Sequence, residues 1–72
     1  MREAARGIGS GVKRRDLIKQ IESSGCVLIR HGGKHDWYQN PGTKVSQPVP
    51  RHRELKEHLA RHILKMLGIP IA

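Results

Sequence analysis

The sequence predicts an α+β fold, in the order α-β-β-β-α, with two helices on one face of a three-stranded antiparallel sheet. Three observations lead to this prediction. Apolar residues recur at helical spacing near both ends of the chain, an apolar run and two turn signals fill its middle, and the chain contains no internal repeat. With 72 residues the chain has room for one small domain, whose hydrophobic core is marginal.

Residues 1–12 contain three glycines and no clear apolar period. We therefore expect a flexible N-terminal lead-in, followed by a single domain over residues 13–72.

The first helix is expected in KRRDLIKQIESSG, residues 13–25. Leu17, Ile18 and Ile21 form one apolar stripe at helical spacing, and Gly25 is a natural stop beyond the last turn.

Three strands follow. CVLIR, residues 26–30, is a continuous apolar run of the kind found in short, well-buried strands. The pair Gly32-Gly33 predicts a two-residue hairpin turn, and HDWYQN, residues 35–40, is the returning strand.

A second turn is predicted at Asn40-Pro41-Gly42, with Pro41 and Gly42 at the central positions of a type II turn. TKVSQPVP, residues 43–50, is the third strand. Its prolines cannot donate to a ladder, so this strand is expected at an edge of the sheet or to end early.

The last helix is predicted in RHRELKEHLARHILKMLGIP, residues 51–70. Its apolar stripe is Leu55, Leu59, Ile63, Met66 and Leu67, and Gly68 with Pro70 ends it. Two helices shield only one side of the sheet, so its other side is expected to be open to a ligand or a protein.

Fourteen Lys and Arg residues against six Asp and Glu residues give a formal net charge of +8. This excess favours a polyanionic partner, usually nucleic acid, sometimes an acidic protein or an anionic membrane. The alternative is that the charge only keeps the protein soluble. The single cysteine, Cys26, suits a reducing setting, and no apolar run approaches the roughly 20 residues that a membrane span needs. We therefore expect a cytoplasmic protein with no membrane partner.

The helix ending in SSG, the strand CVLIR, the stretch GGKHDWYQNPG, the VPRH segment and the terminal ILKMLGI occur in this order between residues 13 and 69. In this the chain resembles the HicA toxins, the small messenger-RNA endonucleases (mRNA interferases) of bacterial toxin–antitoxin pairs. The most specific part is the glycine–x–histidine element Gly33-Lys34-His35, in which Lys34 stands where the family usually has serine.

The resemblance implies a fold like that of double-stranded-RNA-binding domains (dsRBD-like), a catalytic histidine at His35, and the toxin role in a type II toxin–antitoxin system. It also implies two partners, messenger RNA and a HicB-like antitoxin that binds the toxin and occludes His35. The protein is then expected to be a monomer when free and a hetero-oligomer with its antitoxin.

RNA cleavage needs no metal, because the 2′-hydroxyl of RNA supplies the nucleophile, and we expect no cofactor. Histidine is the side chain best matched to the proton steps near neutral pH, and Lys or Arg can stabilise the charged transition state. We predict His35 as general base or acid. The predicted RNA-binding residues are Lys13, Arg30, Lys34, Lys44 and Arg51.

Some alternatives stay open. His35 can instead be an ordinary polar residue of an exposed strand. The second proton-transfer group is not singled out, and His31, His52 and Asp36 are its candidates.

Trp37 and Tyr38 are the only aromatic residues. Neighbours in a strand point to opposite faces, so we expect one to pack under the helices and the other to face outward, where it can stack on a base.

His58 and His62 share a helix face at a spacing used by metal sites, but no further ligand accompanies them, and surface histidines are the better interpretation. Cys26 with His31 and His35 is a weaker metal set, because Cys26 lies in the apolar strand.

The basic run Lys13-Arg14-Arg15 opposes the dipole of the first helix, and is either solvated surface or a contact for phosphate or the antitoxin.

Three functions therefore compete. The leading one is a metal-independent endoribonuclease, and its main rival is an RNA-binding module that does not cleave. The third is an interaction protein whose basic face binds an acidic protein. Substitution of His35 separates the first from the others, and a steep loss of binding with salt separates RNA binding from the third.

Overall fold

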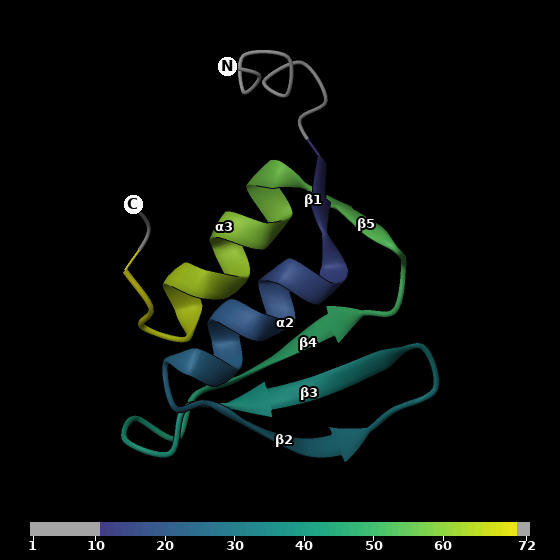
Figure 1. Ribbon diagram of the computed structural model, residues 1–72. Helices are drawn as coiled ribbons and strands as arrows, with labels where there is room; N and C mark the ends of the chain where they lie inside the picture. The colour runs from purple at the N-terminus through teal and green to yellow at the C-terminus, as the bar shows by residue number, and fades with distance from the viewer. Residues whose placement is uncertain (1–10, 71–72) are drawn as a thin grey trace.

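We describe the chain from a computed structural model, which covers residues 11–70. The elements, in chain order, are β1 (Gly11–Lys13), α2 (Arg14–Ser23), β2 (Val27–His31), β3 (His35–Gln39), β4 (Ser46–Pro50), β5 (Glu54–Lys56) and α3 (Glu57–Met66). Strands β2, β3 and β4 form an antiparallel sheet in that order, with both helices on one side of it (Figure 1). The predicted fold class is confirmed.

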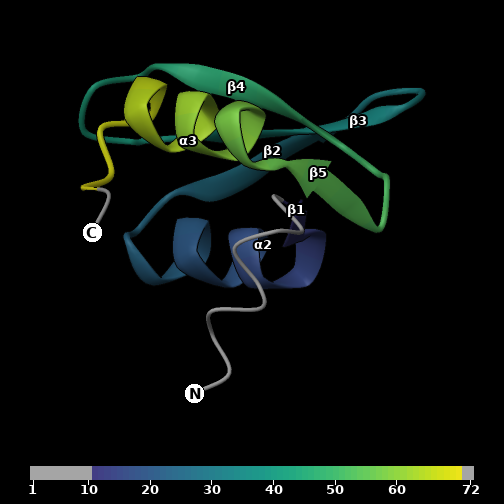
Figure 2. The same cartoon turned by 90° about the horizontal axis from the view of Figure 1, so that it is seen from above.

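A second, two-stranded sheet was not predicted. Strand β1 pairs antiparallel with β5, and Val12 lies opposite Leu55. Gly11 and Val12 were assigned to the lead-in, so that boundary was wrong for these two residues, while the rest of the lead-in lies outside the described part of the chain. Because each of these strands leads directly into a helix, the small sheet ties the beginnings of α2 and α3 together (Figures 1 and 2).

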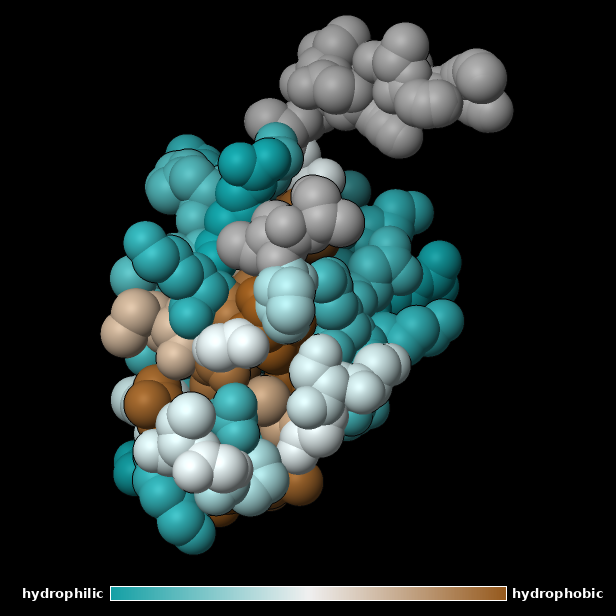
Figure 3. Space-filling model, turned by 90° about the vertical axis from the view of Figure 1, so that its left-hand side faces the viewer, coloured by the Kyte–Doolittle hydropathy of each residue, from teal (hydrophilic) through white to brown (hydrophobic). Residues whose placement is uncertain are grey.

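The hydrophobic core lies between the helices and the sheet. Its members are Leu17, Ile21, Cys26, Tyr38, Val49, Leu55, Ala60, Ile63, Leu64, Leu67 and Ile69. Seen from the side where the helices end, apolar atoms gather in the middle of the surface and hydrophilic atoms surround them (Figure 3). The core placement expected for Cys26 is confirmed, and burial raises the pKa of its thiol.

The C-terminal helix is shorter than predicted. It begins at Glu57, so Leu55 belongs to β5, where its buried side chain still joins the core. The buried stripe of α3 consists of Ala60, Ile63 and Leu64, and Met66 is 43% exposed. The predicted stop is confirmed, since Gly68 adopts a φ of +75° just beyond the helix, as Gly25 does with +93° beyond α2.

Strand β2 is not the well-buried strand that its composition predicts. Val27, Leu28 and Ile29 are 40–48% exposed. The reason is topological, because β2 is an edge strand and lies away from the helices (Figure 1). Strand β4 forms the other edge, as its prolines predict.

Both predicted turns need correction. His31 pairs with Asp36, so the hairpin turn centres on Gly33-Lys34 and not on Gly32-Gly33. Gly32 is nonetheless required, since a Cβ atom there would lie 3.0 Å from the carbonyl oxygen of His35. In the second turn the left-handed residue is Lys44, with a φ of 67°, so the type II assignment was wrong.

The Asn40 side chain explains this second geometry. The side-chain Oδ1 of Asn40 accepts a hydrogen bond from Gly42 N at 2.8 Å. The backbone carbonyl oxygen of Asn40 accepts one from Lys44 N at 2.7 Å. Its Nδ2 donates to the carbonyl oxygen of Leu67, which anchors the turn to the end of α3.

Within residues 11–70, no helix is long and apolar enough to cross a membrane.

Candidate functional site

Strand β3 divides its side chains between two environments. Asp36 and Tyr38 are buried on the side of the helices. His35 and Trp37 alternate with them and therefore face the open side of the sheet. The expected split of the two aromatic residues is confirmed, with Tyr38 in the core and Trp37 half-buried on the open face.

Arg30 covers the ring of Trp37 on this open face. The two residues are paired across β2 and β3, and the guanidinium carbon of Arg30 lies 5.9 Å from the ring centroid. This distance is within the range of a cation–π contact. The open face thus presents a cation beside a flat aromatic ring.

His35 lies at the rim of a shallow depression near the hairpin turn. The residues that line it are Gly33, Lys34, His35, Pro50, Arg51 and His52. His35 is exposed and lies opposite Pro50, the last residue of β4, so the chain beyond β4 brings Arg51 and His52 to the same place. Two histidines and two basic residues therefore line one solvent-accessible hollow.

On the other face, Asp36 is the centre of a charged cluster. Its Oδ2 accepts a hydrogen bond from Arg14 Nη2 at 2.7 Å, and its Oδ1 accepts one from Arg51 Nη2 at 2.7 Å. Arg51 Nε lies 3.0 Å from the same Oδ1, so this arginine grips it with two nitrogens. His31 Nδ1 lies 2.8 Å from Oδ1 as well.

This cluster changes the acid–base behaviour of Asp36. Hydrogen bonds from Arg51 and then from His31 hold the pKa of the carboxyl well below its usual range, against the opposing effect of desolvation. The same pairing raises the pKa of Arg51. Asp36 is therefore an ionised acceptor that holds its neighbours and has no proton to transfer near neutral pH.

Arg51 also fixes the turn that carries His35. Its Nη2 donates to the carbonyl oxygen of Gly32 at 2.9 Å and its Nη1 to that of Gly33 at 3.4 Å. Its backbone N–H donates to the carbonyl oxygen of Lys34 at 3.3 Å. The hairpin tip is thereby anchored to the chain after β4, and through Arg51 to Asp36.

The structure separates the three candidates for a second proton-transfer group. Asp36 is committed to the cluster on the helix side, and His31 is bonded to it. His52 lines the same depression as His35.

The predicted RNA-binding residues are only partly brought together. Lys34 and Arg51 line the depression with His35, and Arg30 lies on the same face over Trp37. Lys13 lines a separate basic pocket that shares Arg51 with this site. Lys44 lies in the β3–β4 turn, at the opposite end of β3 from His35.

The histidines on α3 stay outside this site. His58 and His62 are both exposed on the helix surface. No group of three or more potential metal ligands occurs among residues 11–70.

A family model described as the HicA toxin of bacterial toxin–antitoxin pairs matches residues 14–69. The chain belongs to the HicA toxin family. No curated protein and no solved structure gives a significant match. Family membership identifies the protein as the toxin of a toxin–antitoxin pair, with an antitoxin as its partner.

Sequence reasoning named Arg51 as an RNA-binding residue and Arg14 as part of a basic run, but it missed their contacts with Asp36 in the HicA site. Arg14 and Arg51 meet Asp36 across 22 and 15 positions of the chain, and the pattern gave no signal for either contact. A single acidic residue inside a basic hairpin was the available hint, because a buried carboxylate needs cationic partners.

Proposed function

We propose that this HicA family member is a metal-independent endoribonuclease that cleaves messenger RNA, with His35 as a catalytic residue. The observation that carries the proposal is that His35 and His52 line one exposed depression together with Lys34 and Arg51. Two imidazoles suit the two proton transfers that RNA cleavage requires.

In the proposed reaction, one imidazole removes the proton from the 2′-hydroxyl of the nucleotide at the depression. The 2′-oxygen forms a bond to the adjacent phosphorus, and the bond from phosphorus to the 5′-oxygen breaks. The other imidazole donates a proton to the leaving 5′-oxygen. The products carry a 2′,3′-cyclic phosphate and a 5′-hydroxyl, so that atoms and protons balance without a metal or water.

We assign the two proton transfers to His35 and His52, one as the base and the other as the acid. Gly33 precedes Lys34 at the hairpin turn, and the space where a Cβ atom on Gly33 would lie is open, with no heavy atom within 4 Å. A sugar–phosphate backbone can therefore approach closely. The Lys34 ammonium is available to stabilise the negative charge that develops on the phosphorane.

The open sheet face provides a surface for the rest of the RNA. Trp37, with the Arg30 guanidinium over its ring, forms a flat surface on which an unpaired base can stack. We infer that a HicB-like antitoxin inhibits the toxin by covering His35, and that both proteins act in the cytoplasm, where messenger RNA is translated.

The test is expression of wild type, His35→Ala and His58→Ala in bacteria, with growth and RNA integrity as readouts. Wild type and His58→Ala are expected to arrest growth and degrade messenger RNA, because His58 is an exposed residue of α3 outside the depression. His35→Ala is expected to do neither. Undiminished RNA degradation by His35→Ala would refute the proposal.

A further inference from the structure

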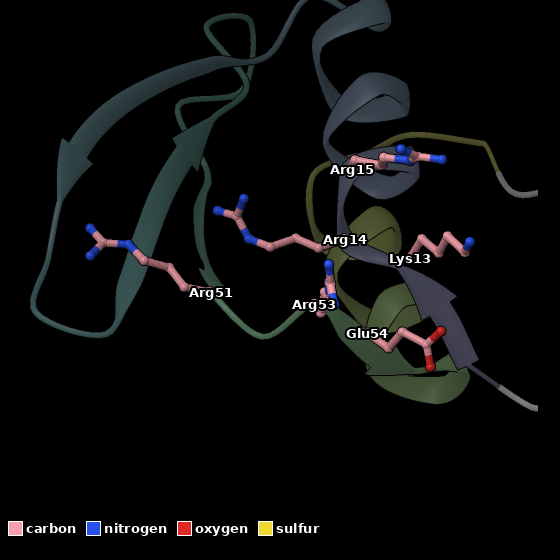
Figure 4. Close-up of a pocket in the computed structure, with 6 residues that line it drawn as sticks. All are labelled: Lys13, Arg14, Arg15, Arg51, Arg53 and Glu54. Atoms are coloured by element: carbon pink, nitrogen blue, oxygen red, sulfur yellow. The ribbon is translucent and has the colours of Figure 1, made fainter.

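A second hollow lies at the beginning of α2, next to the histidine depression. The side chains that line it are Lys13, Arg14, Arg15, Arg51, Arg53 and Glu54 (Figure 4). Five basic residues and one acidic residue therefore line it. Arg51 is among the residues that line both this hollow and the His35 depression, so the two hollows are neighbours.

The walls of this hollow are joined through the backbone. Arg14 N donates to the carbonyl oxygen of Arg53 at 2.9 Å, and Lys13 pairs with Glu54 across β1 and β5. Arg14 Nε donates to the carbonyl oxygen of Pro50 at 2.8 Å. The basic side chains are therefore held in a fixed frame that links α2 to the chain after β4.

The cations divide into two groups by what they contact. Arg14 and Arg51 point toward the sheet in Figure 4, where they bind Asp36. For the side chains of Lys13, Arg15 and Arg53, no hydrogen bond or ion pair to another residue occurs within residues 11–70. All three side chains are exposed.

These charges also lie at an unfavourable place for the stability of the fold. A helix N-terminus carries partial positive charge, and basic residues there are destabilising. No side chain caps the first turn of α2, where Lys13 holds the N-cap position. An anion bound among these exposed cations at the beginning of α2 would reduce both sources of repulsion.

We propose that this hollow binds a backbone phosphate of the RNA, at a position along the strand other than the phosphate being cleaved. The identity of the strand rests on the proposed function, whereas the anion site rests on the side chains and the helix N-terminus. The nearness of the histidine depression, which shares Arg51 with this hollow, favours RNA over an acidic protein segment, because one strand can reach two neighbouring hollows. Arginine is also well suited to phosphate, since its planar guanidinium matches two phosphate oxygens.

The test uses a short 2′-O-methyl RNA, which cannot be cleaved through its 2′-oxygen, and measures binding by fluorescence anisotropy at several salt concentrations. The double variant Arg15→Gln/Arg53→Gln removes two exposed cations from the hollow. Lys19→Gln/Lys65→Gln removes the same charge from exposed helix positions elsewhere and serves as the matched control. Thermal unfolding of each protein verifies that the fold is retained.

The hollow variant is expected to bind the RNA roughly 5-fold more weakly at 0.1 M salt than the control. Its salt slope is expected to be smaller by about 0.7, because one phosphate contact is lost and each such contact contributes about 0.7 to the slope for a single strand. Equal affinity and slope for the two double variants would overturn the proposal. So would a variant that loses affinity for a polyglutamate peptide but keeps its affinity for RNA.

Cleavage by the His35→Ala protein separates this proposal from the catalytic one. Weaker RNA binding by the hollow variant, found together with full cleavage by His35→Ala, supports the phosphate site and counts against the catalytic role of His35.

Discussion

His35 and Asp36 are adjacent in the chain, yet their side chains lie on opposite faces of strand β3. Asp36 faces the helices, where it binds Arg14 and Arg51, and His35 faces solvent beside the depression. Because Arg51 also binds the carbonyl oxygens of the hairpin tip, the buried carboxylate helps to fix the loop that carries the exposed histidine. Because side chains alternate along β3, Asp36 can help to position the turn from the helix side while His35 stays exposed on the other face.

His52 is expected to be the second proton-transfer group. His52→Gln should lower the rate of RNA cleavage by about 10²- to 10⁴-fold, the usual range for loss of a general acid or base. His31→Gln should lower it much less, since His31 bonds to Asp36 and lies outside the depression. The measurement is the cleavage rate of purified variants on one RNA. Equal losses for the two variants would argue against the assignment of His52.

Acid should destabilise the protein through Asp36. The folded protein lowers the pKa of this carboxyl below its ordinary value of 3.8, so the unfolded chain binds a proton that the folded protein does not. Stability from the cluster is therefore complete above that ordinary value and is lost as the pH falls toward the lowered pKa. Asp36→Asn should unfold at a lower temperature at neutral pH, and its melting temperature should fall less on acidification.

The measurement for this prediction is the melting temperature between about pH 6 and pH 2. Glu22→Gln, at an exposed position of α2 outside the cluster, is the control and should show the acid dependence of wild type. An acid dependence of Asp36→Asn equal to that of wild type would show that the cluster does not stabilise the fold.

The two aromatic residues should separate binding from stability. Trp37→Leu should weaken binding of single-stranded RNA by roughly 5- to 150-fold, because stacking on an aromatic ring contributes about 1–3 kcal/mol per base. Its melting temperature should change little, since Trp37 is half-buried on the open face. Tyr38→Leu should do the reverse, because Tyr38 is 5% exposed in the core. RNA affinity unchanged in Trp37→Leu would remove the base-stacking role.

Much of the fold could be predicted from local signals. Gly25 and Gly68 mark the helix ends because they adopt the left-handed backbone that other residues rarely take. The prolines of β4 correctly indicated an edge strand. Glycine and proline restrict or permit backbone conformations locally, so their effect on the structure does not depend on contacts with distant residues.

The errors arose where pairing between distant segments decides the structure. Leu55 and Leu59 have helical spacing, but Leu55 pairs with Val12 in a small sheet whose strands lie far apart in the chain. Strand β2 has a core-like composition, but its place at the sheet edge leaves it exposed. The hairpin register differs by one residue from the glycine pair, because His31 pairs with Asp36.

The residues of the candidate site also fall into two groups, those that a local motif indicates and those that only the pairing of distant strands brings into place. His35 and Lys34 could be selected from a short motif, because they are neighbours in the chain. His52 could be named only as one of three candidates, since the pairing of β3 with β4 is what brings it to His35. Arg53 had no signal in the sequence, and its place in the basic hollow depends on the pairing of β1 with β5.

The most direct test of the proposed reaction is cleavage of a messenger RNA by purified wild type and His35→Ala in the presence of EDTA, with analysis of the product ends. Wild type should cleave in the chelator and leave 2′,3′-cyclic phosphate and 5′-hydroxyl ends. His35→Ala should be slower by at least about 100-fold. Cleavage by His35→Ala at the wild-type rate, or loss of wild-type cleavage in EDTA, would contradict a metal-independent reaction that depends on His35.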